Sequence, residues 1–396
     1  ITRIRDSHPP ATIETKRAMN SKSMCFLPFR LSPILVGICL VIGHHHQYVH
    51  GFLPAAFRRP NGRVSSVKPL GLAKGFGASS SKASKQPPSE KQILKQLKQK
   101  YGGTSPQDIA KGTQRRIDSA LQKQPPHIQL ALQIYQQLQP WNYQLSTMSL
   151  LDQAKIPLEQ MEGAQRAQAE LDRLMKEHDF TTRDLHNLIQ QATWDASADA
   201  KAARSITGEM PSDIQNRVQK ACDIAVQRAL AIDTKTPKVL DVGCGFGVLV
   251  PFLKRSGLSD DQIHGIDLSS EMIRNAQQWY PNCHWKAGDF YSIPMDGKYQ
   301  SIIFCSSLHD MPDQMDAMRK ARDSLCPGGT LVIVHPQGAS HVLNQVRNNP
   351  TMVPRGLPTT TELEALSGWK VVQSPAGPKS QEEMNDGYLA VLERID

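Results

Sequence analysis

One stretch, KVLDVGCGFGVLVPFLKRSG at residues 238–257, constrains the fold of this chain more than any other. A short apolar segment passes through Asp241 into glycines at every second position, Gly243, Gly245 and Gly247, and an apolar helical pattern follows. A strand that runs through a glycine turn into a helix is the opening unit of nucleotide-type cofactor domains. The stretch therefore predicts a cofactor loop at the carboxyl end of a first buried strand.

Strand and helix patterns alternate after this loop, which predicts a doubly wound, Rossmann-like α/β sheet, mainly parallel, with helices on both faces. In such sheets the ligand lies beyond the carboxyl ends of the strands, at the switch point beside the first strand. The predicted strands are residues 238–243, 263–268, 283–289, 301–307 and 330–336, and the predicted helices are Val248–Arg255, Glu271–Trp279 and Pro312–Leu325.

The glycine spacing narrows the choice of cofactor. A dinucleotide fingerprint, G-x-G-x-x-G, needs a third glycine for close helix–strand packing, and counting from Gly243 that position is Val248. The observed pattern, D-x-G-x-G-x-G, suits a ligand without a pyrophosphate, whose carboxylate would meet the free amides that open the next helix. Asp267, at the end of the second strand, could bind the hydroxyls of a ribose, whether the ligand is a dinucleotide or lacks a pyrophosphate. An NAD(P)-dependent oxidoreductase therefore stays as an alternative.

The motif VLDVGCGFG resembles the first motif of class I S-adenosylmethionine-dependent methyltransferases, and the resemblance covers residues 238–336. It implies S-adenosylmethionine as the cofactor, with Asp267 on the ribose and Asp289 on the adenine, beside the ring of Phe290. The structural alternatives are a helix cap for Asp267 and a turn-forming aspartate for Asp289. The binding residues implied by the resemblance are Asp241, Gly243, Cys244, Gly245, Gly247, Asp267, Leu268, Gly288, Asp289, Phe290 and Ser306.

The acceptor side follows the fourth strand, in FCSSLHDMPD. This segment lacks the N/D-P-P-Y/F sequence of family members that methylate adenines and amides, and it resembles the small-molecule branch related to quinone methyltransferases. His309 and His335 fall at strand ends that face the presumed acceptor, so each is a candidate general base, with packing in the loop as the alternative. The resemblance implies direct in-line transfer to a small-molecule acceptor without a metal.

The carboxyl-terminal segment adds two strands, Trp369–Gln373 and Tyr388–Glu393, that fit the antiparallel hairpin closing this family's sheet. Its HPQG…LP…YLAVLE layout also resembles plant organellar methyltransferase-like proteins. The resemblance therefore agrees with a plastid location.

The helical region before the sheet is rich in glutamine and spans residues 89–204, with helices predicted in 105–124, 127–140, 157–180 and 181–194. Its role is either a cap over the site or an interaction surface for a protein partner. A non-catalytic scaffold that binds a partner through this surface and keeps the S-adenosylmethionine site as a relic is a second alternative function. A further helix, opened by Pro211 and Ser212, leads into the first strand of a domain predicted at residues 205–396.

The amino-terminal part has the composition of a targeting leader. An apolar run from Leu31 to Gly43 fits a signal peptide because it is too short to span a bilayer comfortably, and Met19 or Met24 is the expected start. Residues 52–88 are basic, rich in serine and free of acids, which is transit-peptide composition. We expect residues 1–51 and 52–88 to form a bipartite plastid leader, as in algae with secondary plastids; secretion is the alternative.

The net charge and the cysteines bear on nucleic-acid binding, metal binding and cellular compartment. Residues 24–89 contain eight basic and no acidic side chains, and residues 1–23 carry a net charge of +3. Since the whole chain has a net charge of +9, residues 90–396 carry a net charge of about −2. This near-neutral body argues against a nucleic-acid-binding face. Five cysteines follow the leader, without a CxxC pair, which favours a reducing compartment over secretion and predicts no zinc site.

Overall fold

The computed structural model describes residues 105–207, 210–295, 299–375 and 387–395. The predicted leader and the first part of the predicted helical region, residues 89–104, lie outside the described residues. Within them, no helix is long and apolar enough to cross a membrane. Five cysteines in this part of the chain are free thiols, and three of them are buried, namely Cys222, Cys244 and Cys283.

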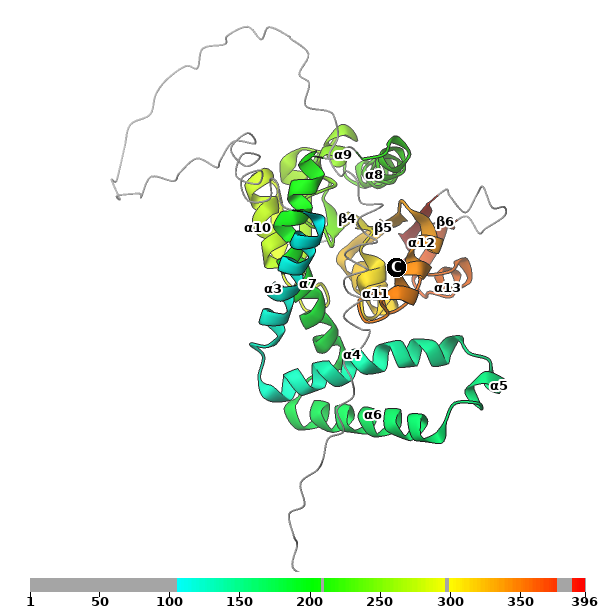
Figure 1. The fold of residues 1–396 in the computed structure, drawn as a ribbon. Coiled ribbons are helices and arrows are strands. Elements are labelled where there is room, and N and C mark those ends of the chain that lie inside the picture. Colours follow the sequence, from blue (N-terminus) through cyan, green and yellow to red (C-terminus); the bar gives the residue numbers. More distant parts are fainter. Residues whose placement is uncertain (1–104, 208–209, 296–298, 376–386, 396) are drawn as a thin grey trace, which may run out of the picture.

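A seven-stranded sheet forms the centre of the molecule, in the order β3-β2-β1-β4-β5-β7-β6 (Figure 1). Strands β1 to β5 pair in parallel, and β7 is antiparallel to both β5 and β6. The predicted doubly wound sheet with an antiparallel hairpin is therefore confirmed. The strands are β1 (Val239–Val242), β2 (Ile263–Asp267), β3 (His284–Ala287), β4 (Tyr299–Cys305), β5 (Leu325–His335), β6 (Trp369–Gln373) and β7 (Tyr388–Arg394).

Alternating side chains of the central strands enter two separate cores. On β4, Ile302 and Phe304 join the core that contains α11, α12 and α13, whereas Ile303 joins the core of α8 and α9. Because both faces are covered, the central strands are apolar nearly throughout. The helices of this half are α8 (Ser212–Ile232), α9 (Val250–Arg255), α10 (Ser270–Trp279), α11 (Gln314–Ser324), α12 (Gly338–Asn348) and α13 (Thr360–Glu364), with short 3₁₀ turns η1 (Asp260–Gln262) and η2 (Leu308–Asp310).

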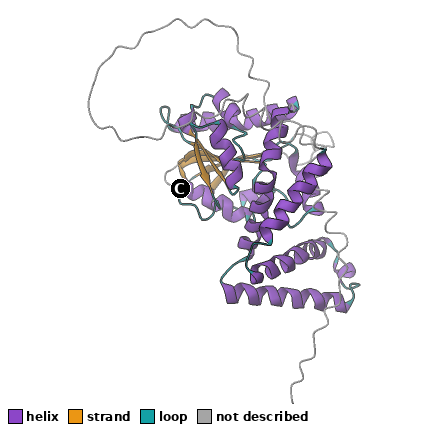
Figure 2. Ribbon diagram, turned by 60° about the vertical axis from the view of Figure 1, so that its left-hand side comes forward, coloured by secondary structure: helices purple, strands orange, loops and turns teal. Residues whose placement is uncertain are grey.

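The helical region consists of two parts. Helices α4 and α6 lie side by side at one end of the molecule, and α7 packs against both α3 and α10 (Figures 1 and 2). Their own core is made by residues such as Leu132, Tyr135 and Leu171. The helices are α3 (Pro106–Leu121), α4 (Pro126–Thr147), α5 (Leu150–Gln153), α6 (Leu158–His178) and α7 (Thr182–Thr207).

Several helices differ from the sequence-based expectation, and the short helices α5 and α13 were not predicted. Helix α4 was predicted to end at Pro140 but continues to Thr147, and Tyr143 beyond the proline packs against the main core of the sheet. Helix α7 extends to Thr207 instead of ending at Trp194. Helix α12 was not predicted, although its buried Val342 and Val346 have the i, i+4 spacing of a helix face. For α4, α7 and α12, packing of the helix against the rest of the domain outweighs a helix-breaking residue or a polar composition.

Candidate functional site

The glycine loop closes tightly against the first residues after β4. Gly243 has φ +74°, and a Cβ atom at this position would lie 2.4 Å from the Cβ of Ser307. Gly245 also has a positive φ, +55°, but a Cβ there would meet no atom within 4 Å, so the loop backbone is open on that side. The predicted glycine turn is thus present: Gly243 is packed against Ser307, whereas the space beside Gly245 is open.

Most amides of this loop are already bonded inside the protein. The N–H groups of Gly243 and Cys244 donate to the carbonyl of Ile266, at 2.8 and 3.1 Å, and that of Gly247 donates to Cys244, at 3.0 Å. Helix α9 begins only at residue 250 and has six residues. The expected contact between the opening amides of this helix and a ligand carboxylate stays a prediction.

Asp267 joins the end of β2 to the glycine loop. One of its carboxylate oxygens accepts a hydrogen bond from the N–H of Gly245, and the other accepts one from the N–H of Ser269, both at 2.8 Å. Each oxygen keeps lone pairs for a ligand hydroxyl. The helix-cap alternative does not hold, since the N-cap of α10 is Ser269, whose Oγ accepts from the N–H of Met272.

Burial changes the acidity of both carboxyl groups beside this loop. It raises the pKa of Asp267 to about 6, although the hydrogen bonds from Ser269 and Gly245 act in the opposite direction. It raises the pKa of Asp241, on β1, to about 8, and the neighbouring Asp267 carboxylate adds to that shift. A hydroxyl-bearing, positively charged ligand would favour the ionised form of both groups.

At the end of β3, Asp289 shows its turn-forming role. Its carboxylate accepts from the N–H of Tyr291, at 3.1 Å, and from the Oγ of Ser292, at 2.9 Å. Phe290 is buried in the core, with its ring 5.7 Å from that of Phe304. The N–H of Gly288 donates to the carbonyl of Asp267, so this segment does lie beside the end of β2. Adenine contacts by Asp289 and Phe290 stay a prediction, as do the contacts of the half-buried Leu268.

The two predicted acceptor-side histidines lie together. His309, in η2, and His335, the last residue of β5, pack edge to face with ring centroids 4.9 Å apart. Both are almost fully buried, and burial lowers the pKa of His309 to about 4, so its imidazole is neutral near pH 7. Ser306 precedes them in the left-handed conformation, with φ +54°. A third ring, that of His341 on α12, stacks 5.5 Å from His335 and was not predicted because α12 was not.

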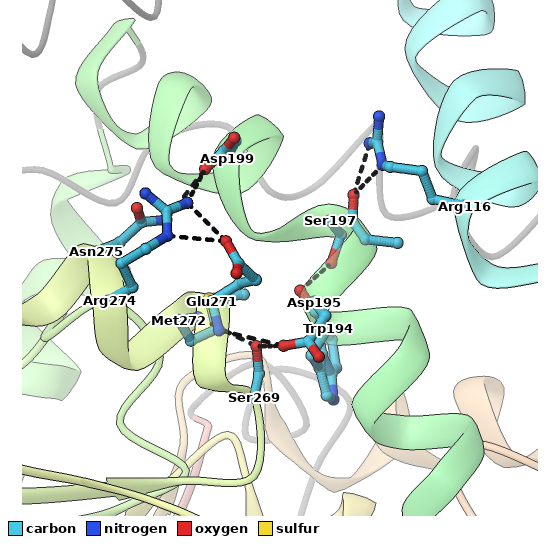
Figure 3. A network of polar contacts seen from close by, with 11 residues as sticks. Arg116, Trp194, Asp195, Ser197, Asp199, Ser269, Glu271, Met272, Arg274 and Asn275 are labelled. Carbon is cyan, nitrogen blue, oxygen red and sulfur yellow. Dashed lines mark hydrogen bonds and ion pairs between the residues drawn. The ribbon is translucent and has the colours of Figure 1, made fainter. Parts of the chain in front are cut away.

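Helix α7 lies over the glycine loop, a placement that sequence reasoning left open. Its Asp195 accepts hydrogen bonds from the Oγ of Ser269, at 2.6 Å, and from the N–H of Glu271, at 3.2 Å (Figure 3). Its Trp194 packs in a cluster with Phe246 and other residues next to the loop. The cluster consists of Trp194, Ala198, Phe246, Val248 and Met272.

The other end of α7 reaches the acceptor side. Nε2 of His186 donates to the carbonyl of Asp310 at 2.8 Å, and Nε2 of Gln190 donates to that of Met352 at 2.6 Å. Burial raises the pKa of the Asp310 carboxyl to about 7. One helix from the amino-terminal region thus contacts the segments that follow β2, β4 and β5, which are the ligand-binding edge of a sheet of this type.

Comparison with known proteins agrees with the motif. Residues 239–329 match the family described as "Methyltransferase domain". A "Putative methyltransferase 235L" of Invertebrate iridescent virus 6 is 36% identical over 69 residues, which is 17% of this chain and 26% of that protein. The demethylmenaquinone methyltransferase of Chlorobaculum tepidum is 28% identical over 103 residues, which is 26% of this chain and 42% of that protein.

Among solved structures, magnesium protoporphyrin IX methyltransferase from Synechocystis with bound SAM is 18% identical, with a TM-score of 0.36, and the match covers 53% of this chain and 97% of that one. The chain spans at most half the length of the first curated relatives that it matches. Within the sheet domain, residues 239–329 are the part of the chain that is similar to a methyltransferase domain.

Proposed function

We propose that this chain is an S-adenosylmethionine-dependent methyltransferase that acts on a small-molecule acceptor. The observation that carries the proposal is the bond between the Asp267 carboxylate and the N–H of Gly245, which places the acid of β2 against the open part of the glycine loop. This pair lies within the segment that matches the methyltransferase domain.

The residues present fit this donor. Asp267 and the open backbone at Gly245 would hold the ribose, and the end of β3 at Asp289 would lie near the base. Bound S-adenosylmethionine supplies an electrophilic methyl group. The protein then needs to align an acceptor and exclude water, and such positioning alone accelerates a reaction by several orders of magnitude.

The geometry disfavours a dinucleotide enzyme. Val248 occupies the place of the third glycine, and its side chain packs in the cluster with Trp194 of α7. An NAD(P)-dependent oxidoreductase would need close helix–strand packing at that position.

A small-molecule acceptor is supported by the relatives, which include demethylmenaquinone and ubiquinone-biosynthesis methyltransferases. His309 is our candidate for accepting the proton of the acceptor, because its imidazole is neutral and its Nδ1 has no hydrogen-bond partner within the described part of the chain. His335 packs directly against it and is the second candidate.

Thermal unfolding with S-adenosylhomocysteine, and separately with NADH, tests the function. At about a hundred times its dissociation constant, a ligand stabilises the folded protein by about 2.7 kcal/mol. We expect this stabilisation with S-adenosylhomocysteine and none with NADH, and loss of the effect in Asp267→Ala. Stabilisation by NADH alone would support the oxidoreductase, and stabilisation by neither ligand would support the scaffold.

We also propose a plastid location, which rests on the composition of residues 24–89 and on the resemblance to plant organellar proteins. A fluorescent protein fused after residue 88 and expressed in an alga with secondary plastids tests it. Fluorescence in the secretory pathway or the medium instead of the plastid would contradict the proposal.

A further inference from the structure

The predicted donor-binding residues leave one ligand charge without a partner. The proposed donor carries a carboxylate, yet the predicted set contains no basic side chain. The loop amides at Gly243, Cys244, Gly245 and Gly247 are bonded within the protein. A carboxylate taken out of water needs a cation or several N–H donors, and a cation on a neighbouring element would supply that partner.

Helix α7 brings a cation to this place. Nζ of Lys201 lies 3.6 Å from the ring centroid of Trp194. Trp194 in turn packs against Phe246 and Val248 of the glycine loop. The ammonium group is therefore held beside the loop by an aromatic ring that is itself packed on it.

The charge of Lys201 acts on both sides of the switch point. It lowers the pKa of Asp267, at the end of β2, and that of Asp310, after β4, in each case against the larger effect of burial. It also lowers the pKa of His309, together with burial. Strand β1 lies between β2 and β4, and the glycine loop that leaves β1 carries Phe246 and Val248, which pack with the Trp194 ring that holds Lys201.

We propose that Lys201 binds the carboxylate of the methyl donor, so that the amino-terminal helical region completes the donor site. This inference rests on the proposed function, because it assumes a donor with an amino-acid end. The competing role for Lys201 is structural: its charge would only balance Asp267 and Asp310.

Two ligands separate these roles. S-adenosylhomocysteine carries the carboxylate, whereas 5′-methylthioadenosine has the same adenosine and thioether but no amino-acid end. Calorimetric titration of the full chain with each ligand gives two dissociation constants for the wild type and for Lys201→Met. Lys201→Arg is the conservative variant, and Lys155→Met is the matched control, because it removes the same charge from an exposed side chain beyond α5.

We expect Lys201→Met to weaken S-adenosylhomocysteine about 10- to 100-fold, the effect of losing one charge-assisted hydrogen bond. Its affinity for 5′-methylthioadenosine should stay at the wild-type value. Lys201→Arg should recover part of the lost affinity, and Lys155→Met should bind both ligands as the wild type does.

Other results overturn the inference in distinguishable ways. If the wild type binds S-adenosylhomocysteine and Lys201→Met binds it equally well, Lys201 is not the carboxylate partner. If Lys201→Met weakens both ligands by the same factor, the lysine supports the fold of the site instead. If the wild type binds neither ligand, the proposed function itself fails, and the inference fails with it.

Discussion

At Gly243 the backbone conformation and the packing both exclude a side chain. Its φ is +74°, and a Cβ atom would approach the Cβ of Ser307 to 2.4 Å, while the Oγ of Ser307 is fixed by a hydrogen bond to the carbonyl of Val242. We expect Gly243→Ala to lower the free energy of unfolding by about 2–4 kcal/mol, from left-handed strain and the steric overlap together. Equilibrium unfolding in urea, without ligand, measures this loss.

Gly328 provides a matched control for this substitution. Its φ is +73°, but a Cβ atom there would meet nothing within 4 Å. Gly328→Ala should therefore lose only the backbone term, about 1 kcal/mol. If both variants lose the same free energy, the contact between Gly243 and Ser307 does not restrict the loop.

Individual residues were predictable where the chemistry is local. Asp267 lies at the carboxyl end of one predicted strand and Gly245 follows another, so the topology of a parallel sheet brings them together, and the structure joins them by a hydrogen bond. Lys201 was not predictable, since its place beside the loop depends on a helix expected to end at Trp194. The burial of His309 was equally hidden, because it comes from rings and helices distant in sequence.

Two carboxylates of α7 bind α10: Asp195 binds the amino-terminal end of α10, and Asp199 forms an ion pair with its Arg274. Asp195 accepts from the Oγ of Ser269, the N-cap of α10, and from the N–H of Glu271 (Figure 3). We expect Asp195→Ala to lower the free energy of unfolding by about 1–2 kcal/mol, the usual cost of losing a cap. Urea unfolding measures it, and the affinity for S-adenosylhomocysteine should fall as well, because the N–H of Ser269 orients Asp267.

Asp199, one turn further along α7, is the control for this prediction. Its ion pair with Arg274, at 3.1 Å, is partly exposed, with the arginine side chain 53% accessible. Asp199→Ala should therefore cost no more than about 1 kcal/mol. Equal destabilisation by the two variants would show that the cap of α10 does not depend on Asp195.

The bounds of strands were predicted best where the alternation of apolar residues ends at a turn-forming residue. The bounds of β6 are those expected, and β2 differs by one residue. Strand β5 begins at Leu325 instead of residue 330, because its pairing with β4 continues across a register shift to Tyr299. Long-range pairing of this kind has no local signal in the sequence.

For the whole molecule, the main outcome is the position of α7 across the carboxyl ends of the strands. Its contacts run from Asp310 and Met352 at one end to Ser269 at the other. Amphipathic patterns predict that a helical region exists but do not tell which surface it covers, since many apolar faces are equivalent partners. The structure therefore favours a cap over the site for α7, while α4 and α6 form a pair at one end of the molecule (Figures 1 and 2).

This arrangement predicts that ligand binding also slows the local opening of α7 in the helical region. Hydrogen exchange of the full chain, followed by mass spectrometry, should slow on adding S-adenosylhomocysteine in two segments, residues 243–247 and residues 194–201 of α7. At a hundred times the dissociation constant, local openings that release the ligand should become about a hundredfold rarer. The tip of the α4–α6 pair, where Leu150 and Leu151 are 82% and 77% exposed, serves as the internal control and should exchange unchanged. Slowing confined to residues 243–247, with α7 exchanging as in the free protein, would mean that α7 is packed on the domain without taking part in binding.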